Sequence, residues 1–476
     1  MIALTSFKGR SVAVFGLGGS GLSCLNALSA GGAHILAFDD SEERCAVAAK
    51  IPGVTILDLR EADWRSIDAL VLSPGVPLTH PEPHWSVRLA QDAGVEIIGD
   101  IELFVRERNK QSPSCPFVAI TGTNGKSTTT ALISHILKQA GFDVQMGGNI
   151  GTPILELEPF DGQGDAERVY VIEVSSYQID LAPNLNPSVG LLLNLSADHL
   201  DRHGTIQNYA QIKARLVAQS KNAIIGVDDR YSANIASNLR VKGNDVVAIS
   251  GFANDRAGVR APDGFLQSKS DGFLFNLDQA RALRGSHNAQ NAAAAVAIAQ
   301  TFNLTPSQIA KGLTSFGGLE HRMEEVGHGK GFLFINDSKG TNADAAARAL
   351  GAFPKVRWIA GGLAKEGGID GLVDHFDRID CAYLIGEAGA DFAETLNQHG
   401  VPFKDCGTLD RALDAAIADG EVARADGESM EEVILLSPAC ASFDQYPNFM
   451  ARGDAFRAKV SAYLNDESET QSQGMA

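Results

Sequence analysis

The chain has 476 residues, more than a single hydrophobic core usually holds, so two to four domains are expected. Hydrophobic residues at 44% and charged residues at 21% exclude a disordered chain. The formal net charge of −18 argues against a nucleic-acid or anionic-membrane partner, because phosphate backbones need clustered Lys and Arg, whereas an anionic small molecule needs only a few local basic groups.

The N-terminal stretch "SVAVFGLGGSGLSCLNAL" predicts a strand followed by a helix. Basic residues precede it, as in a signal peptide, but repeated glycines interrupt the apolar run and no A-x-A cleavage site follows. No apolar run reaches membrane-spanning length, and the six cysteines lack the spacing of a metal or redox site. These features favour a cytoplasmic protein with reduced thiols and no membrane insertion.

Short apolar runs recur along the whole chain and are separated by segments with helical spacing. Continuous rather than alternating runs indicate strands that are covered on both faces, and therefore mainly parallel sheets in α/β layers. Ligands of such layers gather at the carboxyl ends of the strands, so the polar residues that end these runs are candidate site residues. The runs are "SVAVFGLG", "HILAFDD", "ALVLSPG", "PFVAITG", "RVYVIEVSS", "SVGLLLNLS", "NAIIGV", "GFLFINDS", "VRWIAGG", "CAYLIGE" and "VILLSPA".

Two breaks divide the chain into three predicted domains. The polar segment "RERNKQSPSCP" immediately precedes a strand, and "SFGGLEHRMEEV" follows a long alanine-rich helix. The predicted domains are residues 1–108, 109–317 and 318–476. The polar tail at about 465–476 is expected to be disordered.

The first glycine-rich loop, "GLGGSG", follows the first predicted strand, and Asp39 ends the next one. This arrangement is typical of NAD-binding proteins, so a dehydrogenase is one alternative. A second nucleotide loop follows later in the chain and no hydride-transfer site is evident, which argues against that alternative.

The second loop lies in "AITGTNGKSTTT", where a strand ends at Thr121 and a helix begins near Ser127. Gly122 and Gly125 would let backbone N–H groups turn toward phosphate oxygens, and Lys126 would add a positive charge for the β- and γ-phosphates. The Ser127 hydroxyl could reach Mg²⁺. The commonest pattern has another glycine five residues before Gly125, and an isoleucine stands there, so this is a shortened loop. It predicts binding of ATP or a close relative; the alternative is a polar surface turn.

Acidic and imidazole side chains end two further strands. Glu173 ends "VYVIEV" and could hold a metal bound to the phosphates, although a helix cap is an equally good interpretation from the residue alone. His199, in "ADHLD", lies beside Asp198 and Asp201. A single histidine is usually structural, so its role is open at this point.

The shortened phosphate loop resembles that of the Mur ligase superfamily, which includes folylpolyglutamate synthases and whose members use ATP to join an amino acid to a carboxylate. The first domain, with "GLGGSGLSC", "LSPGVP" and "IIGDIELF", is similar to the members that add D-glutamate. The resemblance covers nearly the whole chain except the tail. Its further motifs are "NIGTP", "EVSSYQ", "LNLSADHLDRH", "YAQIKARL", "HNAQNAAAA", "EHRME", "NDSKGTN" and "LLSPACASFDQYPNF".

The resemblance implies a Rossmann-like N-terminal domain for a uridine nucleotide, a central P-loop ATPase-like domain, and a C-terminal Rossmann-like α/β domain for the amino acid. It implies an ATP-dependent ligase of peptidoglycan precursor synthesis, a monomer with two Mg²⁺ ions, whose substrates are UDP-N-acetylmuramoyl-L-alanine and D-glutamate. A carboxylate must be activated before it forms an amide, so the γ-phosphoryl group would first pass to that carboxylate.

The resemblance also implies site residues. Those expected to take part in catalysis are Lys126, Glu173, His199 and Lys213. Those expected to contact ATP are Gly122, Thr123, Asn124, Gly125, Lys126, Ser127, Thr128, Asn288, Asn291, Arg322 and Asp337. Those expected to contact the uridine substrate are Gly18, Ser20, Asp39, Ser73, Pro74, Gly75 and Asn149. Those expected to contact D-glutamate are Lys339, Thr341, Lys365, Ser442 and Phe449. The expected metal ligands are Ser127, Glu173, His199 and Lys213, the last as a carbamate formed with CO₂.

Simpler interpretations stay open for several of these residues. Lys213 reads as a solvated helix lysine, and only the resemblance suggests a carbamate, which needs a neutral amine. Asn288 could cap a helix, Arg322 could form a surface ion pair, and Phe449 could belong to a core. Some family members have Thr-Arg after the aspartate of the second strand, and this chain has Asp-Ser, so uracil contacts at residues 40 and 41 are doubtful.

Two alternative functions remain. One is another ligase of the superfamily, which adds L-alanine, a diamino acid or a dipeptide, or extends folate. The other is a nucleotide-binding regulator without turnover. Phosphate release with D-glutamate and with the other acceptors would separate them.

Overall fold

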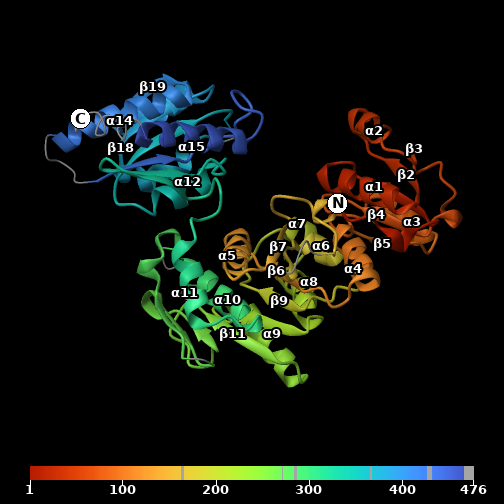
Figure 1. Cartoon of the computed structure of the whole chain (residues 1–476). Coiled ribbons are helices and arrows are strands. Elements are labelled where there is room, and N and C mark those ends of the chain that lie inside the picture. Colours follow the sequence, from red (N-terminus) through yellow and green to blue (C-terminus); the bar gives the residue numbers. More distant parts are fainter. Residues whose placement is uncertain (162–165, 271, 284–286, 365–366, 426–430, 466–476) are drawn as a thin grey trace, which may run out of the picture. The chain divides into compact units, whose positions relative to one another are not determined.

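The computed structural model describes residues 1–161, 166–270, 272–283, 287–364, 367–425 and 431–465 (Figure 1). The chain forms two compact units, Met1–Phe316 and Gly317–Ala476. The first unit holds two β-sheets and the second holds one. Within the described residues no helix is long and apolar enough to cross a membrane.

The first sheet has five parallel strands in the order β3-β2-β1-β4-β5. The chain moves outward from β1 through β2 to β3 and then returns to the other side of β1 as β4, so the carboxyl ends of β1 and β4 flank a topological switch point. Ligands of doubly wound sheets bind at such a point. The elements are β1 (Ser11–Phe15), α1 (Gly19–Gly31), β2 (His34–Phe38), α2 (Glu42–Ala48), β3 (Val54–Ile56), β4 (Ala69–Leu72), α3 (Trp85–Asp92) and β5 (Glu96–Ile98).

The second sheet has nine strands in the order β14-β13-β12-β11-β10-β9-β6-β8-β7. Its strands from β7 to β12 are parallel, and β13 and β14 add an antiparallel ribbon at one edge. The elements are α4 (Asp100–Gln111), β6 (Phe117–Thr121), α5 (Lys126–Gln139), β7 (Asp143–Gly148), β8 (Arg168–Glu173), α6 (Ser176–Asp180), β9 (Val189–Leu192), α7 (Leu200–His203), α8 (Ile206–Ala218), β10 (Asn222–Gly226), α9 (Arg230–Val241), β11 (Val246–Ser250), β12 (Val259–Arg260), β13 (Phe265–Ser268), β14 (Leu274–Asn276), α10 (His287–Thr301) and α11 (Pro306–Ser315).

Buried carboxylates of α4 join the first two sheets. Asp100 accepts a hydrogen bond of 2.9 Å from the Gln178 side chain, and Glu102 accepts one of 3.0 Å from the backbone N–H of Asn184. Glu107 accepts one of 2.6 Å from the Thr5 hydroxyl. These acceptors are fully or almost fully buried, and each has a donor, so the two sheets are held in one compact unit.

The third sheet, in the second unit, has the order β15-β16-β20-β17-β18-β19, in which only β15 runs antiparallel to its neighbour. The α/β class with mainly parallel sheets is therefore confirmed. The elements are β15 (Glu324–Gly329), β16 (Phe332–Asn336), α12 (Ala343–Leu350), β17 (Val356–Gly361), β18 (Ile379–Ile385), α13 (Gly389–Gln398), β19 (Phe403–Gly407), α14 (Leu409–Ala425), β20 (Glu432–Leu436) and α15 (Phe449–Asn465). The predicted disordered tail lies outside the described residues, apart from the end of α15 at Asn465.

Candidate functional site

The glycine loop between β6 and α5 has the geometry of a phosphate-binding loop. The N–H groups of Thr123 and Asn124 donate to the backbone oxygen and the side-chain oxygen of Asn194, each at 2.9 Å, which fixes the loop against the end of β9. Lys126 is the first residue of α5, and its Nζ donates to the Thr123 carbonyl at 2.9 Å. A helix N-terminus with a flanking lysine is a ready anion site.

Gly125 precedes α5 with φ of 81°, and a Cβ built on it would lie 2.3 Å from Oδ1 of Asn291. We expect Gly125→Ala to raise the KM for ATP about tenfold or more, because the left-handed backbone and the clash both distort the loop. Gly141→Ala is the matched control at the other end of α5. Its φ is 99° and nothing lies within 4 Å of its Cβ, so it should cost about 1 kcal/mol of stability without changing that KM. Equal KM values for the two variants would contradict the expectation.

The two asparagines predicted for the adenine side lie together at the start of α10. Nδ2 of Asn291 donates to Oδ1 of Asn288 at 3.0 Å, and both residues are buried. Asn291 packs against the phosphate loop at Gly125. Sequence reasoning missed Asn194, although its position directly after a strand was the signal that could have found it.

Glu173 ends β8 and is 2% exposed. Its Oε1 accepts a hydrogen bond of 2.8 Å from Nδ2 of Asn149, whereas Oε2 has no hydrogen-bond partner among the described residues. A buried carboxylate oxygen without a donor costs free energy unless a cation or water meets it. The residues present therefore fit a divalent cation. No group of three His, Cys, Asp or Glu that could hold a metal ion gathers within the described part of the chain.

Lys213, on α8, is a buried lysine and not a solvated one. It is 1% exposed, and its Nζ donates to Oγ1 of Thr121 at 2.9 Å and to the carbonyl of Gly122 at 3.0 Å. Burial lowers its pKa well below the ordinary value, and the charge of Lys126 acts in the same direction. The neutral amine is the form that reacts with CO₂, so the environment suits the expected carbamate.

His199 lies at the start of α7 with a left-handed backbone, φ 52°. Its side chain is 48% exposed, with Nε2 3.4 Å from Oδ2 of Asp198. The carboxylates of Asp198 and Glu173 both act on the pKa of Lys213, opposing its decrease. One of these acidic groups ends β8 and the other lies in the segment between β9 and α7, and both are near enough to act on the buried amine.

A cavity of about 940 Å³ lies at the switch point of the first sheet. Of the residues predicted for the uridine substrate, Gly18, Asp39, Ser73 and Gly75 line it, whereas Ser20 and Pro74 do not. Asp39 accepts hydrogen bonds from the N–H groups of Leu17, at 2.6 Å, and Ser41, at 2.9 Å. Despite its burial, these donors and Arg44 lower the pKa of Asp39, so the carboxylate is charged.

The other lining residues of this cavity test two predictions made from the sequence, the one for residues 40 and 41 and the one for Asn149. Asp40 and Ser41, where uracil contacts were doubtful, belong to the lining, and so do Arg44 and His84, which sequence reasoning missed. Asn149 is not part of the lining and lies at Glu173 instead.

In the second unit, Asp337 follows β16 and is buried beside Arg322. Asp337 accepts hydrogen bonds from the Ser437 hydroxyl at 2.6 Å and from the backbone N–H of Met323 at 3.2 Å. Burial raises its pKa to about 6, and the hydrogen bond from Ser437 and the charge of Arg322 oppose that rise. A bonded, charged carboxylate here suits contact with hydroxyl groups such as those of ribose.

The described residues predicted for the amino acid lie after β16, after β20 and at the start of α15. Nζ of Lys339 is 5.7 Å from the centre of the Phe449 ring, and Phe449 is partly buried. Ser442 is buried, and Thr341 donates its N–H to the Lys339 carbonyl at 2.9 Å. Lys365 lies outside the described residues.

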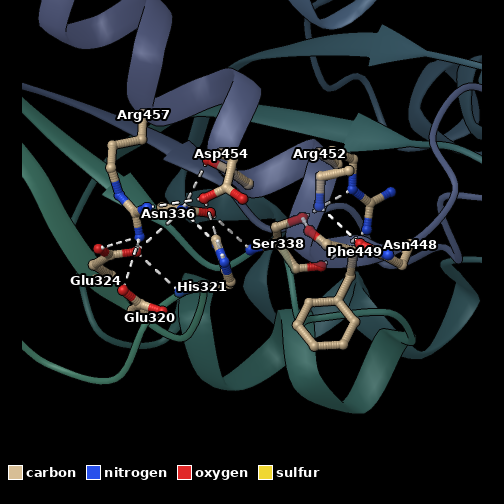
Figure 2. Close-up of polar contacts among 12 residues, drawn as sticks. Glu320, His321, Glu324, Asn336, Ser338, Asn448, Phe449, Arg452, Asp454 and Arg457 are labelled. Carbon is tan, nitrogen blue, oxygen red and sulfur yellow. Dashed lines mark hydrogen bonds and ion pairs between the residues drawn. The ribbon is translucent and has the colours of Figure 1, made fainter. Parts of the chain in front are cut away.

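Arg452, on α15, holds these loops together (Figure 2). Its guanidinium donates to the Ser338 hydroxyl and carbonyl at 3.0 and 2.9 Å, and to the Cys440 carbonyl at 3.1 Å. The Ser338 hydroxyl in turn donates to the Phe449 carbonyl at 2.8 Å. Burial lowers the pKa of Arg452 to about 10, so the side chain keeps a positive charge beneath the loops that carry Lys339 and Ser442.

A parallel α/β chain with a shortened phosphate loop, a buried acid at the adjacent strand end and a buried lysine defines an ATP-dependent ligase, and the chain belongs to the Mur ligase family. Three family models match it: "Mur ligase MurD-like, N-terminal domain" at residues 10–99, "Mur ligase middle domain" at 120–299 and "Mur ligase, glutamate ligase domain" at 321–440.

Curated relatives of nearly full length bear the name UDP-N-acetylmuramoylalanine--D-glutamate ligase. The Agrobacterium fabrum protein is 54% identical over 470 residues, with 97% of each chain covered. The Rhizobium johnstonii protein is 56% identical over 465 residues, again with 97% of each covered. Among solved structures, UDP-N-acetylmuramate-alanine ligase from Thermotoga maritima matches 95% of this chain and 99% of its own, with a TM-score of 0.55 and 17% identity. That likeness confirms the fold, and membership of a ligase family argues against the dehydrogenase alternative.

Proposed function

We propose that this chain uses ATP to join D-glutamate to the alanyl carboxylate of UDP-N-acetylmuramoyl-L-alanine, a cytoplasmic step of peptidoglycan precursor synthesis. The phosphate loop beside the buried pair of Glu173 and Lys213 supports phosphoryl transfer. Relatives at 54–56% identity that bear the name of this ligase support the choice of substrates. We propose that the protein acts as a monomer.

In the reaction, an oxygen of the alanyl carboxylate attacks the γ-phosphorus of ATP, and ADP leaves with the electrons of the broken bond. The amine of D-glutamate then attacks the carbonyl carbon of the acyl phosphate, and the tetrahedral intermediate loses inorganic phosphate and a proton to give the amide. Lys126, at the N-terminus of α5, stabilises the charge that develops on the transferred group.

We assign metal binding to Glu173, His199, Ser127 and the carbamate of Lys213, with two Mg²⁺ ions. When bound there, the ions would supply positive charge that neutralises the phosphate oxygens facing the incoming carboxylate. Glu173 contributes its unpartnered Oε2, and Lys213 becomes an anion only after its neutral amine has taken up CO₂.

We further assign the three predicted domains, residues 1–108, 109–317 and 318–476, to the uridine nucleotide, to ATP and to the amino acid. In the first, the cavity at the switch point takes the uridine diphosphate. Asn149, in the second, contacts the same substrate from beside Glu173. In the last, a dianionic amino acid needs positive charge and hydroxyl donors, which Lys339, Lys365, Thr341 and Ser442 supply.

The choice of amino acid separates this proposal from its alternatives. We expect ATP-dependent phosphate release with UDP-N-acetylmuramoyl-L-alanine and D-glutamate, and release at least about a hundredfold slower with L-glutamate, L-alanine, diaminopimelate or D-alanyl-D-alanine. Faster release with one of those acceptors would favour another ligase of the family. Tight ATP binding with no release under any condition would favour a regulator without turnover.

A further inference from the structure

Arg202, on α7, contacts the loop that follows β4 in the first sheet. Its Nη1 donates to the Gly75 carbonyl at 2.9 Å, and its Nη2 donates to the carbonyls of Val76 at 3.0 Å and Pro74 at 3.5 Å. Gly75 and Val76 line the 940 Å³ cavity. Arg202, a side chain from the part of the unit built on the second sheet, therefore fixes the backbone of a loop that forms part of the wall of the cavity at the first sheet.

The other end of this contact is the segment that carries His199. The N–H of Arg202 donates to the His199 carbonyl at 3.1 Å, so the two residues share one helical turn. The guanidinium of Arg202 lies 4.7 Å from the centre of the Tyr177 ring, and the same ring lies 5.2 Å from the His199 ring. Tyr177 is on α6, just after Glu173, and α6 and α7 lie beside the carboxyl end of the sheet (Figure 1).

The hydrogen bonds from Arg202 to three carbonyls also set the direction of the peptide groups in the loop that follows β4. In a trans peptide the C=O and N–H point in opposite directions, so carbonyls that face Arg202 turn the N–H of Gly75 away from it. The N–H of Val76 closes a turn by donating to the Ser73 carbonyl at 2.9 Å. No hydrogen bond from the N–H of Gly75 occurs within the described residues, and Gly75 lines the cavity, so this N–H is a candidate donor to an anionic group there.

We propose that Arg202 is a positioning residue that couples occupancy of the first-domain cavity by a nucleoside diphosphate to metal binding at His199. This rests on the proposed function. An anion held by the loop stabilises the loop conformation that Arg202 requires, and Arg202 in that position fixes the turn that presents the His199 imidazole. By linkage, a metal ion at His199 strengthens nucleotide binding by the same factor.

The test compares the unmodified protein with Arg202→Lys, because an ammonium group cannot span three carbonyls as the planar guanidinium does. Arg202→Gln is the second variant. Arg230→Lys is the matched control. Arg230 also lies over a tyrosine, 4.6 Å from the centre of the Tyr231 ring, but it is exposed and makes no hydrogen bond to the Pro74–Val76 loop within the described residues.

Calorimetry gives the Kd of UDP-N-acetylmuramoyl-L-alanine. The electron paramagnetic resonance signal of free Mn²⁺ gives metal affinity with and without that substrate, in the presence of a non-hydrolysable ATP analogue.

We expect the substrate to tighten Mn²⁺ binding about fivefold or more in the unmodified protein and in Arg230→Lys. In both Arg202 variants the effect should fall below about twofold, and the substrate Kd should rise about tenfold, with melting temperatures that rule out unfolding. Undiminished coupling in a folded Arg202 variant overturns the inference while leaving the ligase proposal intact. Failure of the unmodified protein to bind the substrate overturns the ligase proposal and the inference together.

Discussion

Replacement of Lys126 by alanine should lower the rate of ATP-dependent phosphate release by about 10³-fold, which is about 4 kcal/mol of transition-state stabilisation. Lys126 begins α5 and points its Nζ at the phosphate loop, where it donates to the Thr123 carbonyl. Its positive charge counts most when the γ-phosphoryl group passes between two anions, so kcat should fall more than the affinity for ATP. Steady-state phosphate release and calorimetric ATP binding measure the two effects.

Lys138→Ala is the control for this substitution. Lys138 lies in the last turn of the same helix and is exposed, so its loss should leave kcat within about twofold and the melting temperature nearly unchanged. Turnover of Lys126→Ala at the rate of Lys138→Ala would remove Lys126 from the proposed mechanism.

The second large effect is expected for Lys213→Arg. Arginine keeps a positive charge but forms no carbamate, so kcat should fall about 10²-fold or more through loss of a metal-holding anion. Burial lowers the pKa of this amine well below its ordinary value, which favours the neutral form that reacts with CO₂. Incubation with ¹³C-labelled bicarbonate should give a carbamate resonance in the unmodified protein and none in the variant.

The exposed Lys221, which follows α8, provides the matched control Lys221→Arg. That variant should keep both the turnover and the ¹³C resonance. Calorimetric binding of UDP-N-acetylmuramoyl-L-alanine checks that Lys213→Arg is folded. Near-normal turnover of a folded Lys213→Arg would exclude the carbamate from the reaction.

The fold could be predicted from the sequence where strands are apolar throughout. Every apolar run named above forms a strand of a mainly parallel sheet, because burial on both faces demands such runs. Most strands that escaped prediction lie at or near a sheet edge, although the interior strand β11, with the sequence "VVAIS", was missed as well. The strand β19 has partly or fully exposed residues along its whole length, and β13 and β14 form a short antiparallel ribbon of four and three residues.

Candidate site residues could be predicted from the sequence where they directly follow or end a strand. The phosphate loop and Glu173 directly end strands, so the strand-end rule found them. Arg202 and Arg452 could not be found in this way, because each lies on a helix and its partners are distant in sequence. Arg452, for example, donates to Ser338, 114 residues away. Likewise, the burial of Lys213 depends on the packing of α8 under the phosphate loop, which no local pattern in "NYAQIKARLV" reveals.

Transfer of oxygen from the substrate carboxylate to phosphate is the most direct test of the acyl-phosphate mechanism. UDP-N-acetylmuramoyl-L-alanine labelled with ¹⁸O in both carboxylate oxygens is incubated with the protein, ATP, Mg²⁺ and D-glutamate, and the products are analysed by mass spectrometry. The acyl-phosphate mechanism places one ¹⁸O in each inorganic phosphate and one in the new amide carbonyl. Unlabelled phosphate, or no phosphate release in the complete mixture, would contradict it.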